Sequence, residues 1–192
     1  GEVKAIVGGR GEKTESLSLN RATESARQPG SCFKIVSTYA PALDIGAMGL
    51  HTSIKDEPYR YKNGKEVNNW DFSYKGWVTV RKAIEQSMNV VAVKALTEIG
   101  EQTGFDYLKS FGFSTVVDQE VINGQTFSDI QQATALGGIT HGVYNLEMTA
   151  AYASLANNGT YTKPKFYTKI LDHSGNVLID NTSETHQVVK AS

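Results

Sequence analysis

The sequence predicts one mixed helix-and-sheet domain, and three observations lead to this class. Segments with strand character open the chain and return near its end, at residues 2–9 and 165–180. Between them, apolar residues recur every three or four positions, which is the spacing of helices that bury one face. The 192 residues, 40% of them apolar, are enough for a single domain with a sizeable core.

The first elements are predicted to be two paired strands. EVKAIVGG, residues 2–9, has a strand pattern, and residues 16–19 alternate serine with leucine. Alternation of apolar and polar residues is typical of a half-buried strand. Because Gly8-Gly9 breaks the chain between the two segments, we expect an antiparallel pair.

A helix is predicted over residues 31–43, where Phe33, Val36, Ala40 and Leu43 recur at helical spacing. Pro41 does not fit a regular helix, since an interior proline removes a backbone hydrogen bond. We therefore expect a kink or a break at Pro41.

Residues 51–77 are predicted to be irregular, and they are rich in aromatic side chains. These residues are Tyr59, Tyr61, Trp70, Phe72, Tyr74 and Trp77. They could form the wall of a groove, or they could anchor a long loop to the core. The second interpretation is the simpler one, because long loops need apolar anchors.

The remaining elements are mostly helices. We expect a short helix after Thr79 as its cap, a second from Asn89 to Gly100, and a turn or two over residues 104–113. Further helices are predicted after a Ser-x-x-Gln capping box at Ser128 and Gln131, and over 146–157 with Asn145 before it and Asn158-Gly159 after it. Residues 165–180 are predicted to be a β-hairpin that turns at 173–176.

Composition excludes several functions. The net charge is −1 without a run of basic residues, so neither nucleic acid nor a polybasic membrane patch is indicated as a partner. Cys32 is the only cysteine, and no apolar stretch is long enough to span a membrane. Since the four histidines are scattered, we expect no zinc site and no cofactor. No histidine lies near Cys32 in sequence to support a thiol nucleophile, and we interpret it as a small apolar helix residue.

The segment RQPGSCFK, residues 27–34, places Ser31 and Lys34 three positions apart at the start of a helix. On one helix face, a hydroxyl beside an amine is a nucleophile beside a base. Burial against the apolar neighbours Phe33 and Val36 would lower the pKa of the Lys34 amine and let it accept a proton. Ser31 could equally be a simple helix cap beside a solvated lysine, and the local pattern does not decide between the two.

A Ser-x-Asn pattern at Ser87 and Asn89 joins two predicted helices. From such a short connection, the hydroxyl and the amide can project together into a site. Ser-x-Asn also occurs at residues 18–20 in a predicted strand and at 174–176 in a predicted turn, where neither would lie near a helix start. Capping of the two helices is the alternative role of the residues at 87–89.

Taken together, these segments resemble one family. SCFK at 31–34 and SMN at 87–89 look like the first two motifs of the penicillin-recognising serine acyltransferases. NRA at 20–22, RQPGS at 27–31, residues 76–94 and residues 135–161 are similar to the transpeptidase domain of class A (bifunctional) penicillin-binding proteins. The similarity covers nearly all of the chain in the expected order.

The resemblance implies an α+β fold with an antiparallel sheet flanked by helices, and a peptidoglycan D,D-transpeptidase without a cofactor. In that family Ser31 would be the nucleophile, Lys34 the base and Ser87 a proton relay. Asn89 would bind the substrate amide. Gly137, Gly138 and Thr140 fall where the family lines its groove, although helix termination explains the glycines equally well. The substrates would be stem peptides that end in D-Ala-D-Ala, and β-lactams would acylate the same serine.

The family's third motif, Lys-Thr-Gly, is absent from the sequence. The resemblance therefore implies that residues 1–192 are the N-terminal portion of one transpeptidase domain, with the remainder a separate or lost segment. It also implies an upstream glycosyltransferase domain and membrane anchor, and a location on the extracytoplasmic face of the cytoplasmic membrane. A β-lactamase-like hydrolase is an alternative, but no Glu-x-x-Leu-Asn is present; a non-catalytic penicillin-binding sensor or scaffold is the other.

Overall fold

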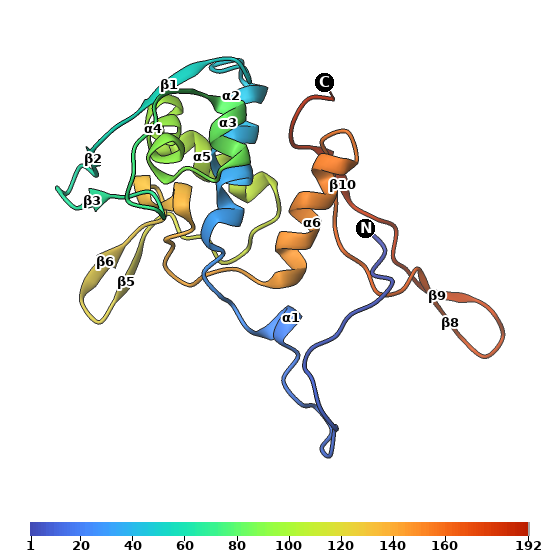
Figure 1. The fold of residues 1–192 in the computed structure, drawn as a ribbon. Coiled ribbons are helices and arrows are strands. Elements are labelled where there is room, and N and C mark those ends of the chain that lie inside the picture. The colour runs from blue at the N-terminus through green and yellow to red at the C-terminus, as the bar shows by residue number, and fades with distance from the viewer. Residues whose placement is uncertain (192) are drawn as a thin grey trace.

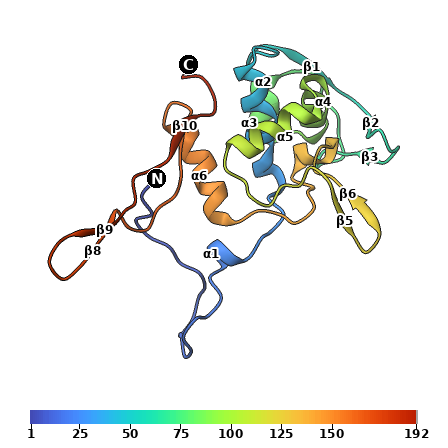
Figure 2. The same ribbon diagram turned by 180° about the vertical axis from the view of Figure 1, so that it is seen from behind.

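Helices gather on one side of the molecule around the segment that begins at Gly30 (Figures 1 and 2). The computed structural model describes residues 1–191 and has the predicted α+β class. The helical elements are α1 Arg21–Glu24, η1 Gly30–Cys32, η2 Lys34–Tyr39, α2 Ala40–Asp44, α3 Val80–Glu85, α4 Asn89–Ile99, α5 Glu101–Ser110, η3 Gln132–Leu136 and α6 Asn145–Ala156. No helix among these residues is both long and apolar enough to cross a membrane.

The segment from 30 to 44 runs through the centre of the core. Phe33 and Val36 are fully buried in one apolar cluster with side chains of α5 and α6, whereas Tyr39 and Ala42 join a second cluster with α3 and α4. Its two ends thus belong to different parts of the core, and this fixes the segment in place.

The helix predicted over 31–43 is not a single α-helix. The segment is a 3-10 turn, then the π-helix η2, and then the α-helix α2, in which Pro41 occupies the first turn. A proline cannot donate to the carbonyl four residues before it, and the wider π turn accommodates that loss directly ahead of Pro41. The predicted distortion at Pro41 is confirmed in this form.

The strands within residues 1–191 form five two-stranded antiparallel sheets, so no larger sheet is assembled from them. The pairs are β1 Ser53–Asp56 with β4 Gly76–Thr79, β2 Tyr59–Arg60 with β3 Glu66–Val67, β5 Glu120–Ile122 with β6 Gln125–Phe127, β7 Thr160–Thr162 with β10 Thr185–Gln187, and β8 Lys169–Leu171 with β9 Val177–Asp180. The hairpins β2–β3, β5–β6 and β8–β9 project from the body of the molecule (Figure 1).

Several predicted boundaries are confirmed. Thr79 caps α3 by accepting a hydrogen bond from the Lys82 backbone N–H, and α4 extends from Asn89 to Ile99 before Gly100. The β8–β9 hairpin turns where it is predicted, and α6 begins one residue earlier than expected, at Asn145.

Other boundaries are wrong. Residues 51–77 contain four short strands, and α5 is longer than a turn or two. The capping box does not form, because Gln131 is extended and the Ser128 Oγ accepts instead from the Ile130 backbone N–H. The β5–β6 hairpin was not predicted, although Asn123-Gly124 at its turn is a strong sequence signal for one.

The predicted strand pair at the N-terminus is also wrong. Residues 2–9 make one isolated bridge, between Glu2 and Lys165, and the Gly8 carbonyl accepts from the Arg21 N–H. Val7 and Leu17 are exposed, and Leu17 has a positive φ of 58°. Alternation specifies a strand only where one face is buried, and these side chains have no such face in residues 1–191.

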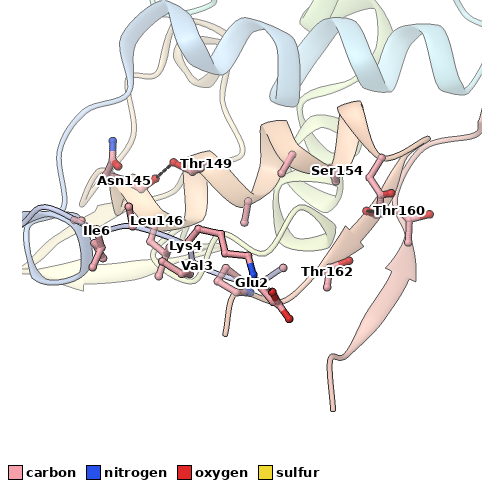
Figure 3. Close-up of a pocket in the computed structure, with 17 residues that line it drawn as sticks. Glu2, Val3, Lys4, Ile6, Asn145, Leu146, Thr149, Ser154, Thr160 and Thr162 are labelled. Atoms are coloured by element: carbon pink, nitrogen blue, oxygen red, sulfur yellow. Dashed lines mark hydrogen bonds and ion pairs between the residues drawn. The ribbon is translucent and has the colours of Figure 1, made fainter. Parts of the chain in front are cut away.

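A cavity of about 570 Å³ lies between the N-terminal segment and α6 (Figure 3). Its lining comes from residues 1–6, from α6 and from β7, and includes Ile6, Leu146 and Thr149. None of the predicted site residues lines it, so the candidate site lies elsewhere.

Candidate active site

Ser31 lies at the solvent-exposed start of the central helical segment. Gly30, directly before it, has a φ of +57°, a left-handed conformation that glycine adopts without strain. The two residues Arg27 and Gln28, which precede this turn, are held by hydrogen bonds. Arg27 exchanges backbone hydrogen bonds of 3.0 and 2.9 Å with Val143, and the Gln28 side-chain amide bonds both the N–H and the carbonyl of Ile139. The backbone that leads into the helical segment is therefore fixed ahead of Ser31.

Lys34 is buried one turn further along, with 3% of its surface exposed. Its Nζ lies 3.0 Å from Ser87 Oγ, 2.5 Å from the Ser87 carbonyl oxygen and 2.6 Å from Asn89 Oδ1. The structure therefore brings three of the predicted site residues together, across more than 50 positions of sequence. All three contacting atoms are uncharged.

Burial lowers the pKa of the Lys34 amine from its ordinary 10.5 to about 8. Removing an ammonium group from water disfavours its charged form, and no carboxylate in residues 1–191 forms an ion pair with it to offset that cost. At pH 7 about one lysine in ten is then uncharged. An uncharged amine has a lone pair that can take a proton from a hydroxyl.

The Ser31 hydroxyl does not share this hydrogen-bond network. The Lys34 amine is directed to the 87–89 turn, and the hydroxyl of Ser31 remains exposed on the preceding turn of the same helical segment. Ser31 thus lies three positions before Lys34 in the same helical segment and forms no hydrogen bond with Lys34, Ser87 or Asn89.

The 87–89 turn has an unusual backbone. Ser87 has a φ of +51°, which costs a non-glycine residue free energy and is found at sites where function requires a particular geometry. Met88 is buried and anchors the turn in the core, and Asn89 then begins α4. As a result the Ser87 carbonyl and the Asn89 amide both face Lys34.

Asn68 and Asn69, which the sequence did not indicate, hold this turn through hydrogen bonds to Asn89. The Asn89 side chain donates to the Asn68 carbonyl at 2.8 Å, and the Asn89 backbone N–H donates to Asn69 Oδ1 at 2.9 Å. Both residues lie in the aromatic-rich region that is predicted to be a loop anchored to the core. No periodicity or spacing in the sequence links them to residues 87–89.

Gly137, Gly138 and Thr140 differ in their positions. A Cβ on Gly137 would come within 2.4 Å of the Gly30 backbone nitrogen, so Gly137 packs directly against the turn that precedes Ser31. Gly138 borders a separate groove beside Lys62 and Gln131. The Thr140 hydroxyl donates to the buried Asp129 carboxylate at 2.7 Å. Only Gly137 of these three therefore contacts the Ser31 turn directly, and substrate binding by them stays a prediction.

Metal binding would need a cluster of histidine, cysteine, aspartate or glutamate side chains. No cluster of three or more occurs in the described part of the chain. The chemistry that these residues offer is that of a hydroxyl, an amine of lowered pKa and an amide.

Known proteins are similar to this chain over nearly its whole length. The family model described as "Penicillin binding protein transpeptidase domain" matches residues 1–192. Curated relatives include penicillin-binding protein 1A of Clostridium acetobutylicum, 38% identical over 98% of this chain, and that of Clostridium tetani, 35% identical over 98%. The chain spans 24% of the length of each of these relatives.

Solved structures show the same fold. Penicillin-binding protein 1A from Haemophilus influenzae matches 87% of this chain and 24% of its own, with a TM-score of 0.70 and 29% identity. PonA1 from Mycobacterium tuberculosis, solved in complex with penicillin V, matches 92% of this chain and 46% of its own, with a TM-score of 0.76 and 22% identity. The chain belongs to the penicillin-binding protein transpeptidase domain family.

Proposed function

We propose that this chain carries the serine, lysine and Ser-x-Asn groups of a peptidoglycan D,D-transpeptidase, with Ser31 as the nucleophile. The observation that carries the proposal is the buried Lys34 amine, held against Ser87 and Asn89 one turn after an exposed serine. A lysine that served only as a solvated residue on a helix surface would keep its amine in contact with water. Its lowered pKa suits a base that works near neutral pH.

In the proposed acylation step, Ser31 Oγ attacks the carbonyl carbon of the penultimate D-alanine and the Lys34 amine takes the hydroxyl proton. The backbone N–H of Ser31 stabilises the oxyanion of the tetrahedral intermediate. The bond to the terminal D-alanine then breaks, and its amine leaves with a proton relayed through Ser87, which contacts Lys34 at 3.0 Å. The product is an ester of Ser31.

In the second step, the amine of a neighbouring stem peptide attacks that ester, and Ser31 regains its proton as the cross-link forms. Asn89 contributes to both steps as a substrate-positioning residue. One of its amide hydrogens donates to the Asn68 carbonyl, and its Oδ1 faces Lys34. The second amide hydrogen is then the group that would bind a substrate carbonyl.

β-Lactams would acylate Ser31 as mimics of the D-Ala-D-Ala substrate. Penicillin V is bound by the structurally similar PonA1 protein, and that likeness supports the proposal for this chain. The relatives are penicillin-binding proteins 1A, which supports a place in the bacterial cell envelope, in a class A protein with glycosyltransferase and anchoring segments of its own. Completion of the site by a Lys-Thr-Gly strand stays a prediction.

Labelling with a fluorescent penicillin, beside a Ser31→Ala variant, tests the nucleophile. We expect one stable adduct, located on the peptide that contains Ser31 by mass spectrometry, and none on the variant. Label that persists on Ser31→Ala would reject the assignment.

The fate of the adduct separates the alternatives. A β-lactamase-like hydrolase would release the label within minutes, whereas a sensor or scaffold would keep it and yet release no D-alanine from a stem-peptide analogue. A transpeptidase keeps the penicillin label and transfers the peptide to an added amine.

A further inference from the structure

A buried amide, that of Asn69, contacts the start of α4 on one side and a buried carboxylate on the other. Its side chain is 4% exposed. Its Oδ1 accepts from the backbone N–H of Asn89 at 2.9 Å and of Val90 at 3.3 Å. The first N–H groups of a helix have no partner inside the helix, and Met88 at the N-cap position supplies none. Asn69 therefore caps α4 from another part of the chain.

The carboxylate of Asp56 and the Ser73 carbonyl, which accepts from Asn69 Nδ2 at 3.0 Å, together determine how this amide is oriented. Asp56 is 1% exposed, and its oxygens accept from Asn69 Nδ2 at 2.9 and 3.0 Å and from the Lys75 backbone N–H at 2.8 Å. A carboxylate only accepts, so the Asn69 Nδ2 must face Asp56 and the Oδ1 must face α4. No cation among residues 1–191 forms an ion pair with Asp56, and a buried carboxylate without such a partner is costly. A role in stability alone is therefore a poor explanation for it.

We propose that Asn69, oriented by Asp56, is a positioning residue that holds the 87–89 turn against the Lys34 amine. The proposal rests on the proposed function of Lys34 as the base. Ser87 is in a left-handed conformation that an isolated turn would leave. Asn69 accepts a hydrogen bond from the Asn89 backbone N–H, so the chain is fixed two positions after Ser87. The Ser87 carbonyl and Asn89 Oδ1 therefore stay in contact with Lys34 Nζ.

The neighbouring Asn68 also helps to hold Asn89 in place. Its carbonyl accepts from Asn89 Nδ2, and this leaves the Asn89 Oδ1 for Lys34. Because Asn68 and Asn69 are adjacent, loosening of this segment would release both the backbone and the side chain of Asn89. Water would then reach the Lys34 amine.

Competitive acetylation of amines over pH 6–11, read on the Lys34 peptide by mass spectrometry, tests this inference in the protein and its variants. Asn69→Ala removes the cap, and Asp56→Asn keeps the volume but replaces an acceptor oxygen by a donor. Tyr107→Phe is the matched control, since it removes one tertiary hydrogen bond, to Asp44, which is no part of the hydrogen-bond network of Lys34, Ser87 and Asn89.

We expect the midpoint for Lys34 to rise by at least one pH unit in Asn69→Ala and in Asp56→Asn, and to stay near that of the parent in Tyr107→Phe. Each unit lowers the uncharged fraction at pH 7 about tenfold, so penicillin acylation should fall about tenfold or more in the first two variants. Circular dichroism and thermal unfolding report whether each variant is folded.

An unchanged Lys34 midpoint in a folded Asn69→Ala protein would overturn the inference. Should Asn69→Ala fail to fold, Asp56→Asn decides by the same criterion, and failure of both to fold would assign the network to stability alone. Acetylation does not involve Ser31. A protein that never reacts with penicillin would therefore refute the proposed function and still yield the Lys34 midpoint.

Discussion

The protonation state of Lys34 should control acylation of Ser31, and this can be tested by pH and by Lys34→Arg. With a pKa of about 8 for Lys34, about 9% of the amine is uncharged at pH 7. At the ordinary value of 10.5, the uncharged fraction would be about 0.03%, or roughly 300-fold less. Burial of Lys34 thus raises the population of the uncharged amine at neutral pH by a factor of roughly 300.

The assay is the rate of labelling by a fluorescent penicillin between pH 6 and pH 10. We expect the rate to rise about tenfold per pH unit below pH 8 and to level off above it. Arginine remains charged throughout this range, so Lys34→Arg should lose nearly all labelling while thermal unfolding shows a folded protein. A rate that is flat across the range, or a folded Lys34→Arg protein that labels as fast as the parent, would refute the role of the uncharged amine.

The same shift predicts how stability depends on pH. The pKa of Lys34 is lower in the folded state than in the unfolded state, so between about pH 8 and pH 10.5 the unfolded chain binds more protons. The contribution of Lys34 to the free energy of unfolding should therefore rise with pH across this window. Urea unfolding at several pH values, compared with Lys34→Met, isolates that contribution; a contribution that falls with pH would contradict the shift.

Three further substitutions have outcomes that the structure specifies. Gly137→Ala should lower the free energy of unfolding by about 1–3 kcal/mol, because the new Cβ would meet the Gly30 backbone at 2.4 Å. Urea unfolding measures this cost. Gly64→Ala, which has a similar φ but lies in open space, is the control and should lower the free energy of unfolding by less. Ser87→Ala should slow penicillin acylation by about 10²–10⁴-fold with little change in melting temperature, and an unchanged rate would remove Ser87 from the mechanism. Thr79→Ala should cost about 1 kcal/mol through loss of the α3 cap, and a cost near zero would show that the cap is replaced by water.

Features encoded over short stretches of chain were predictable from the sequence. The cap at Thr79, the stop at Gly100 and the turn at 173–176 each depend on a few neighbouring residues, and the structure confirms them. The chemical groups of the candidate site also lie in short contiguous patterns, Ser-x-x-Lys and Ser-x-Asn, although these patterns alone did not decide between catalysis and helix capping. Even the missed β5–β6 hairpin had a local signal, the Asn-Gly pair at its turn.

Packing between segments that are distant in sequence determined the remaining features of the fold. The π-helix ahead of Pro41 depends on how that segment fits between two core clusters, and residues 2–9 fail to form a strand because they have no neighbouring strand among residues 1–191. Strand pairing and helix packing join positions far apart in sequence, so a local pattern cannot specify them.

The sequence by itself determined which groups are available: a hydroxyl at Ser31, an amine at Lys34, and the hydroxyl and amide at Ser87 and Asn89. Only the tertiary structure decided that the Lys34 amine lies out of water against the 87–89 turn, and that Asn69 holds this turn from the far side. The physical reason is that the pKa of an amine is determined by its distance from water and from neighbouring dipoles, and both depend on contacts between segments that the chain separates by 20 residues or more.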